Sequence, residues 1–243
     1  MIERTLEKIA MNAWPAFESF EMDSWVLRFA KGYTKRANSV TILGDNTTNL
    51  EDKILFCEAQ FRERGLKSIF RLPSFIAPAS LDKMLEQRGY DLVDLTYVMQ
   101  RSLVDWQGHP FNISKNGVGE WLDAYHNISD ATNKQNESHL RILTSIQAEA
   151  QYCTYQHQEE TVACGLGVLE NGYFGLFDLV TTKNQRRKGF ATALVSGMLD
   201  DAIKKAARTA YLQVVQNNIH AVQLYKNLGF TKQYAYWYRV KSL

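Results

Sequence analysis

Positions 179 to 191 of the chain read Leu179-Val180-Thr181-Thr182-Lys183-Asn184-Gln185-Arg186-Arg187-Lys188-Gly189-Phe190-Ala191. This segment has the pattern of an apolar strand, a short basic loop and the first turn of an amphipathic helix beginning at Gly189. A helix N-terminus presents N–H groups without intrahelical partners and a partial positive charge, so it favours phosphate groups. Gly189 allows close approach to the backbone, and the three cationic side chains before it add charge at the same place. The segment therefore predicts a phosphate-binding site, but a solvated basic loop before a surface helix would give the same pattern.

A second informative segment follows after one expected strand and reads Asn218-Ile219-His220-Ala221-Val222-Gln223-Leu224-Tyr225-Lys226-Asn227-Leu228-Gly229-Phe230. Asn218 and Tyr225 are separated by about two helical turns, or roughly 10 Å along one face of a helix. On that face the Tyr225 phenol could protonate a departing thiolate, and the Asn218 amide could hydrogen-bond an extended ligand. The alternative is that Tyr225 is an ordinary core residue and that Asn218 is an N-cap.

The elements around these segments alternate between strands and helices. Two expected strands at 161–170 and 173–180 flank Asn171-Gly172, the dipeptide typical of a type I′ hairpin turn. The other elements expected in this part of the chain are helices at 118–127, 137–147, 189–205 and 218–228 and strands at 211–215 and 230–240. The fold class that follows is α/β.

Taken together, Arg186-x-x-Gly189-x-Ala191, a strand, and Asn218-x-x-Ala221-x-x-Leu224-Tyr225-x-x-x-Gly229-Phe230 resemble the GNAT superfamily of acyl-CoA-dependent N-acetyltransferases. The resemblance covers residues 161 to 239. It implies an α/β fold of the α+β type, with a mixed, mostly antiparallel sheet that is flanked by helices and splayed between two parallel strands. It also implies that acetyl-CoA binds as co-substrate in the gap between those two strands.

The resemblance also implies roles for individual residues. The backbone of Leu179 and Thr181 would hydrogen-bond the pantetheine arm, Asn218 would lie beside that arm, and Tyr225 would protonate the departing CoA thiolate. A run of amides would wrap the pyrophosphate, contributed by Arg186, Arg187, Lys188, Gly189, Phe190 and Ala191. Ala191 stands where many members have glycine, and Thr181-Thr182-Lys183 stands where Val-x-Pro is common. Both departures are minor, because alanine is an accepted variant and the contact near Thr181 is made by backbone.

The general base is the least defined part of this expectation. Members of the superfamily often carry a Glu or Asp on the strands that face the acceptor. Asp178 is the carboxylate nearest the basic loop, and Glu170 at the hairpin end is the second candidate. Strand alternation places Asp178 and Val180 on one face. Leu179 and Thr181 share the other face, and alternation does not decide which of the two faces meets the acceptor. Asp178 is the first candidate for the base because of its place nearest the loop, and the alternative is a supporting or structural carboxylate.

An internal comparison indicates a repeat with an offset of 140 positions. The aligned pairs are Leu72 with Leu212, Met84 with Leu224, Gly89 with Gly229 and Tyr90 with Phe230. General similarity between any two β-α-β units is the alternative explanation. Segment 104–110 combines Gly108 and Pro110 after an expected strand, so it is the best candidate boundary. We predict two tandem GNAT-like halves, an N-terminal α/β domain at 1–105 and an acetyltransferase domain at 106–243.

The N-terminal half lacks the residues that the resemblance assigns to the cofactor. The same offset aligns Gly189 with Asn49, Ala191 with Glu51, Asn218 with Pro78 and Tyr225 with Leu85. Glu51 at a helix N-terminus would repel a phosphate, and a leucine cannot donate a proton. We therefore expect this half to bind no CoA, and to wall the acceptor site or stabilise the other half.

The composition argues against several other classes of protein. The chain has 243 residues, with 28 Lys and Arg against 26 Asp and Glu, and this balance favours no nucleic-acid partner. No apolar run approaches the ~18–20 residues of a membrane span. The five histidines show no HxH or HExxH spacing, so no metal site is expected. Three cysteines without CxxC spacing predict free thiols in a reducing compartment and favour a cytoplasmic protein.

The combined expectation is an N-acetyltransferase in which a primary amine of a small molecule or peptide attacks acetyl-CoA directly in a ternary complex. The alternative is a non-catalytic CoA-binding module that regulates or scaffolds. The acceptor amine, the acyl chain length and the choice between monomer and homodimer stay open.

Overall fold

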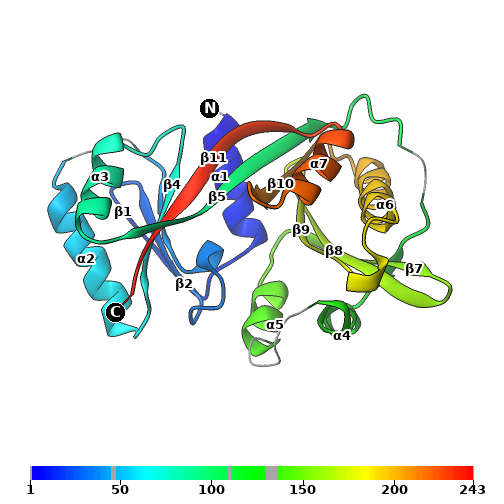
Figure 1. Cartoon of the computed structure of the whole chain (residues 1–243), viewed down its shortest axis with the longest axis horizontal. Helices are drawn as coiled ribbons and strands as arrows, with labels where there is room; N and C mark the ends of the chain where they lie inside the picture. The colour runs from blue at the N-terminus through cyan, green and yellow to red at the C-terminus, as the bar shows by residue number, and fades with distance from the viewer. Residues whose placement is uncertain (1, 45–47, 109–110, 130–135, 243) are drawn as a thin grey trace. The chain divides into compact units, whose positions relative to one another are not determined.

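The computed structural model describes residues 2–44, 48–108, 111–129 and 136–242. These residues form two compact units (Figure 1). Unit 1 contains Met1–Val98, Val214–Asn218 and Lys232–Leu243, and unit 2 contains Met99–Gln213 and Ile219–Thr231. Each unit has the predicted architecture, a mixed and mostly antiparallel sheet flanked by helices.

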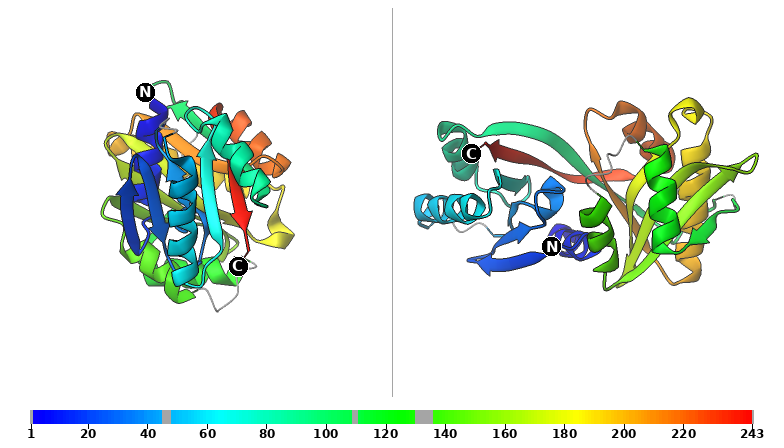
Figure 2. Two further views of the ribbon diagram at one scale, coloured as in Figure 1. Left: turned by 90° about the vertical axis from the view of Figure 1, so that its left-hand side faces the viewer. Right: turned by 90° about the horizontal axis from the view of Figure 1, so that it is seen from below.

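The strands of unit 1 are hydrogen-bonded in the order β1-β2-β3-β4-β11-β5. The elements are α1 (Ile2–Ala13), β1 (Glu18–Met22), β2 (Trp25–Phe29), β3 (Val40–Ile42), α2 (Leu50–Glu63), β4 (Ser68–Pro73), α3 (Ala79–Gln87), β5 (Asp91–Ser102) and β11 (Thr231–Lys241). β3 and β4 pair in parallel, whereas β1 with β2, β2 with β3 and β4 with β11 pair antiparallel. The left view of Figure 2 shows α2 running alongside these strands, and Ile54 and Phe61 of α2 belong to the buried core.

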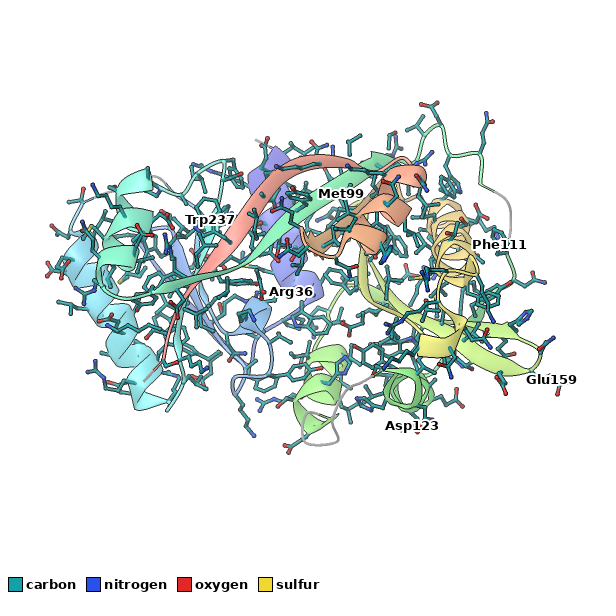
Figure 3. The ribbon with its side chains drawn as sticks, in the orientation of Figure 1. Arg36, Met99, Phe111, Asp123, Glu159 and Trp237 are labelled. Carbon is teal, nitrogen blue, oxygen red and sulfur yellow. The ribbon has the colours of Figure 1, made fainter. Side chains whose placement is uncertain are left out.

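The strands of unit 2 follow the order β5-β10-β9-β8-β7-β6, with only the end of β5 belonging to this unit. The elements are β6 (Ser114–Asn116), α4 (Val118–Ile128), α5 (Asn136–Thr144), β7 (Glu149–His157), β8 (Glu160–Glu170), β9 (Tyr173–Thr181), α6 (Phe190–Lys204), β10 (Thr209–Val215) and α7 (Ile219–Asn227). β9 and β10 are parallel, and β6 to β9 form an antiparallel run. Figure 3 labels Glu159, which marks the exposed turn between β7 and β8.

Different helices cover the two faces of the unit 2 sheet (Figure 1). Beside Gly165 of β8, two side chains of α6 occupy the space that a Cβ would need, so this face packs against α6. On the opposite face, Trp121 of α4 contacts Tyr152 of β7 with ring centroids 5.7 Å apart. Tyr152 pairs with Leu166, the neighbour of Gly165 on β8, which places the two residues of this pair on the α4 side. A side chain of β9 therefore points either to the face covered by α6 or to the face covered by α4 and α5. Its position in the pleat decides between them.

The hairpin expected at Asn171-Gly172 is confirmed. β8 and β9 pair directly across the turn, and φ is 51° at Asn171 and 80° at Gly172. Both central residues thus have the positive φ of a type I′ turn. The predicted helices at 189–205 and 218–228 are also present, as α6 and α7. The prediction missed β1, β6 and β7, whose polar and charged residues hide the strand pattern.

The two units repeat one fold, as the sequence offset predicts. α2 begins at Leu50 and α6 at Phe190, and α3 begins at Ala79 and α7 at Ile219, so both pairs of helices keep the offset of 140. Each of α2 and α6 connects two parallel strands, β3 to β4 and β9 to β10. The expected tandem architecture is therefore confirmed at the level of secondary structure.

The terminal strands are exchanged between the repeats. β5 follows α3 along the chain and is a neighbour of β10, whereas β11 follows α7 and is a neighbour of β4. The compact units therefore divide the chain differently from the predicted domains 1–105 and 106–243, and that division stays a prediction. Residues 109–110 of its boundary segment lie outside the described residues.

Candidate active site

The basic loop leads into α6 through two residues with left-handed backbone. φ is 64° at Arg187 and 88° at Gly189, the residue that precedes α6. A Cβ at Gly189 would have no heavy atom within 4 Å, so the backbone here is open to a ligand. No side chain caps the helix, and its first backbone bond joins Ala193 N–H to Gly189 O at 2.9 Å. The exposed N-terminus of α6, with Arg186 and Lys188 beside it, has the chemistry that a pyrophosphate requires.

The end of β9 separates from β10 just before this loop. Parallel pairing runs from Tyr173 with Thr209 to Leu176 with Leu212, and among the described residues no pair lies beyond it. Leu179 and Thr181 come after this point, while the other edge of β9 still pairs with β8. The backbone edge of β9 that faces β10 is therefore not paired with β10 near Leu179 and Thr181. A strand that hydrogen-bonds an extended pantetheine arm needs backbone groups of this kind.

Asp178 occupies a β-bulge in β9. Leu166 pairs with Phe177 and Cys164 with Val180, so two residues of β9 stand opposite one residue of β8. Strict alternation after Phe177 would direct Asp178 towards α6. Asp178 instead adopts a φ of 46°, and its carboxylate reaches α5, on the other face. The bulge thus turns Asp178 to the same face as Val180, which agrees with the expectation from the sequence.

The partner of Asp178 is His139, a residue that the sequence analysis did not select. His139 Nε2 lies 2.8 Å from Asp178 Oδ2. The His139 side chain is 1% exposed and the Asp178 side chain 17% exposed. The two residues are 39 positions apart and belong to different elements, so no spacing motif could have connected them. The only available signal was a histidine within an expected amphipathic helix.

Aromatic rings from α4 surround the His139 imidazole. Its ring centroid lies 6.1 Å from Trp121, 5.3 Å from Tyr125 and 5.8 Å from His126, and each ring meets the imidazole steeply. Trp121 donates its indole N–H to Cys153 O of β7 at 3.1 Å, which fixes the cluster to the sheet. Burial lowers the pKa of His126, and the neighbouring His139 lowers it further, so His126 is neutral at pH 7.

Tyr225 lies on α7 and is half-buried. Its ring centroid is 6.0 Å from that of Phe230, and its carbonyl accepts the Phe230 N–H at 2.9 Å. Burial raises the pKa of Tyr225 to about 12, so the phenol keeps its proton throughout the neutral range. Asn218 is exposed and comes directly before α7.

The three cysteines are buried thiols. Cys57, Cys153 and Cys164 are free and buried, and burial raises the pKa of each thiol to about 12. Reactive thiolates are therefore absent from these positions at neutral pH.

Among the described residues, no group of three or more His, Cys, Asp or Glu side chains is arranged to hold a metal ion. Within the same part of the chain, no helix has the length and apolar composition needed to span a membrane.

The parallel strands that separate, the open helix N-terminus and the repeated architecture define a tandem GNAT acetyltransferase fold. A GCN5-related N-acetyltransferase from Kribbella flavida has the same fold, with a TM-score of 0.74, 13% identity and coverage of 97% of this chain and 95% of that one. A tandem GNAT protein from the clavulanic acid biosynthesis pathway gives a TM-score of 0.65 at 9% identity, covering 97% and 87% of the two chains.

The chain belongs to the family described as "Probable histone acetyltransferase Rv0428c C-terminal", whose model matches residues 2–239. It is also similar along its length to an uncharacterized N-acetyltransferase, YobR, of Bacillus subtilis (strain 168). The two sequences are 27% identical over 252 aligned positions that cover 98% of each chain. The relatives of this chain are thus N-acetyltransferases of the GNAT type.

Proposed function

We propose that this protein transfers the acetyl group of acetyl-CoA to a primary amine by direct attack in a ternary complex. The observation that carries the proposal is the open N-terminus of α6, where Arg187 and Gly189 have left-handed backbone and no side chain caps the helix. The amides of Arg186 to Ala191 would hold the pyrophosphate, and the backbone of Leu179 and Thr181 would hold the pantetheine arm. Asn218 would lie beside that arm.

In this mechanism the protein binds, orients and moves protons. The amine arrives as an ammonium ion and loses a proton to the Asp178 carboxylate. Its lone pair then attacks the thioester carbonyl, and the C–S bond breaks as the sulfur takes the electron pair. The nitrogen then releases its second proton to solvent, which leaves the neutral amide. Holding both reactants in place supplies much of the rate, and general acid–base groups typically add a factor of about 10²–10⁴.

The raised pKa of Tyr225 limits what it can do as an acid. A thiolate has a conjugate-acid pKa of about 8.5, well below the pKa of about 12 for this phenol. Full proton transfer from Tyr225 to the thiolate is therefore unfavourable, whereas hydrogen-bond donation to the developing negative charge is not. Tyr225 would stabilise the leaving thiolate by donating a hydrogen bond to it. The thiolate would then take its proton from solvent.

Substituting Tyr225→Phe should lower kcat by about 10- to 100-fold, because one hydrogen bond to a charged group contributes about 1.5–3 kcal/mol. The dissociation constant of acetyl-CoA should stay within twofold. Because the phenol is protonated below its pKa of about 12, Tyr225 should also cause no decline of kcat between pH 7 and 10. Steady-state kinetics across this pH range would measure both effects. Equal kcat values for the two proteins would move the donor role to another residue.

Binding of the co-substrate can be tested before the acceptor is known. Saturation with acetyl-CoA at about 100 times its dissociation constant should stabilise the protein by roughly 2.7 kcal/mol, or about 5–10 °C in melting temperature. ATP at the same concentration controls for a general effect of polyphosphates. An equal shift with ATP, or no shift with acetyl-CoA, would contradict the proposed site.

The test of catalytic activity uses a panel of acceptor amines. The family description refers to histones, so the panel should include a lysine-containing peptide together with a peptide with a free N-terminus, spermidine and free lysine. Release of free thiol above the rate without amine would support the enzyme. Binding of acetyl-CoA without thiol release on any amine would favour the non-catalytic CoA-binding module. The cytoplasmic location stays a prediction from the sequence, and the choice between monomer and homodimer stays open.

A further inference from the structure

The strained backbone of Asp178 calls for an explanation. A non-glycine residue at φ 46° within a strand is uncommon and strained, so surrounding contacts must hold it. One of these contacts is the hydrogen bond with His139, which comes from a separate helix. Strain combined with a buried partner from another element indicates that the position of this carboxylate is itself under constraint.

The surroundings of His139 fix the direction of its Nε2 atom. The side chain is 1% exposed, and the rings of Trp121 and Tyr125 pack against it. An ionised carboxylate can only accept hydrogen bonds, so in the short contact His139 Nε2–H donates to Asp178 Oδ2. This bond occupies one carboxylate oxygen and leaves Oδ1 for another proton donor.

We infer that His139 is a positioning residue that holds the Asp178 carboxylate, through Nε2–H and Oδ2, in the orientation needed to take the proton of the acceptor ammonium. The inference rests on the proposed function. The ammonium N–H proton passes to Asp178 Oδ1 and later to solvent, and the freed lone pair attacks the thioester carbonyl. His139 keeps its own proton throughout and touches no reacting atom.

The charged and titratable groups around this pair come from several elements. α5 supplies His139 and β9 supplies Asp178, whereas α4 faces them with Tyr125 and His126. β7 supplies Tyr152, whose hydroxyl donates to Leu143 O of α5 at 3.0 Å. Of these groups, His139 is the one that the structure shows hydrogen-bonded to Asp178. Variants of His139 and Asp178 can therefore be tested singly and in combination.

Two amide variants separate the hydrogen bond from general packing. In His139→Gln the side-chain nitrogen falls near the position of Nε2, so donation to Asp178 is retained. In His139→Asn the amide falls near the position of Nδ1 and is too short to reach Oδ2. His126→Gln changes a neighbouring imidazole of the same cluster and serves as the matched control. Melting temperatures establish that each variant is folded.

The measurement is kcat and KM for acetyl-CoA, with the amine of the panel above that wild type acetylates fastest. His139→Asn should lower kcat by about tenfold or more, within the range of general-base effects. His139→Gln and His126→Gln should stay within threefold of wild type, and KM for acetyl-CoA should change by less than twofold. In an Asp178→Asn background, His139→Asn should lower kcat by less than twofold further, since the two residues act together.

The outcomes distinguish failure of this inference from failure of the proposed function. If wild type acetylates no amine of the panel, the proposed function is wrong and the role of His139 falls with it. If wild type is active and the Gln and Asn variants lose kcat equally, His139 serves packing alone. Full activity of His139→Asn, or additive losses with Asp178→Asn, would also overturn the inference.

Discussion

Replacing Gly189 by glutamate should weaken acetyl-CoA binding by at least about 100-fold. The new side chain would project from a backbone position that has no heavy atom within 4 Å, into the space assigned to the pyrophosphate. Two like charges 4 Å apart repel by about 4 kcal/mol at an effective dielectric of about 20, and solvent screening reduces this value at an exposed loop. Isothermal titration with acetyl-CoA would measure the change.

Two further variants separate charge from backbone strain. Gly189→Ala introduces the same strain at φ 88° without the charge, so it should bind acetyl-CoA much better than Gly189→Glu. Gly89→Glu places a glutamate at a glycine of unit 1 with φ 81° and equally open space, and it should leave binding unchanged. An unaltered dissociation constant for Gly189→Glu would remove the phosphate site from the α6 N-terminus.

The parts of the site that were predictable from the sequence are local. The helix that starts after Gly189 and the turn at Asn171-Gly172 depend on neighbouring residues, because glycine and asparagine adopt backbone angles that few others adopt. The offset of 140 likewise gave both pairs of repeated helices, since their apolar spacing and terminal glycines are visible in the sequence. Local chemistry was therefore enough to place the strand, loop and helix.

The parts that were not predictable depend on register and on distant contacts. The bulge at Asp178 arises where β9 gains one residue against β8, and no residue type in β9 marks that point. His139 reaches Asp178 from a helix 39 positions away. The exchange of β5 and β11 between the repeats leaves no mark in the sequence. Each of these segments has the residue pattern of a strand, whichever strand it pairs with. These features follow from tertiary packing, which a single sequence does not display.

A buried ion pair joins helix α1 to the sheet of unit 1. Glu7 of α1 is fully buried and Arg71 of β4 is 2% exposed, and the two side chains form a bidentate pair with one N···O distance of 3.0 Å. The Tyr234 hydroxyl of β11 also donates to Glu7, and the Arg71 guanidinium stacks on the Tyr236 ring at 3.7 Å. The pair thus connects α1 to two strands of the sheet, and neither charge has water to replace its partner.

Removing one partner should therefore be far more harmful than removing both. Arg71→Leu leaves the Glu7 carboxylate buried without its cation and should destabilise the protein by about 3–5 kcal/mol, or about 10 °C in melting temperature. The double variant Glu7→Leu with Arg71→Met should recover most of this loss, since an apolar pair of similar volume leaves no buried charge. Glu18→Ala, which breaks the exposed pair with Arg64, should change stability by less than about 1 kcal/mol.

Thermal and urea denaturation of wild type, the two single variants and the double variant would test this order of stability. A double variant as unstable as Arg71→Leu would mean that the shape of the two side chains, rather than their charge, holds α1 on the sheet.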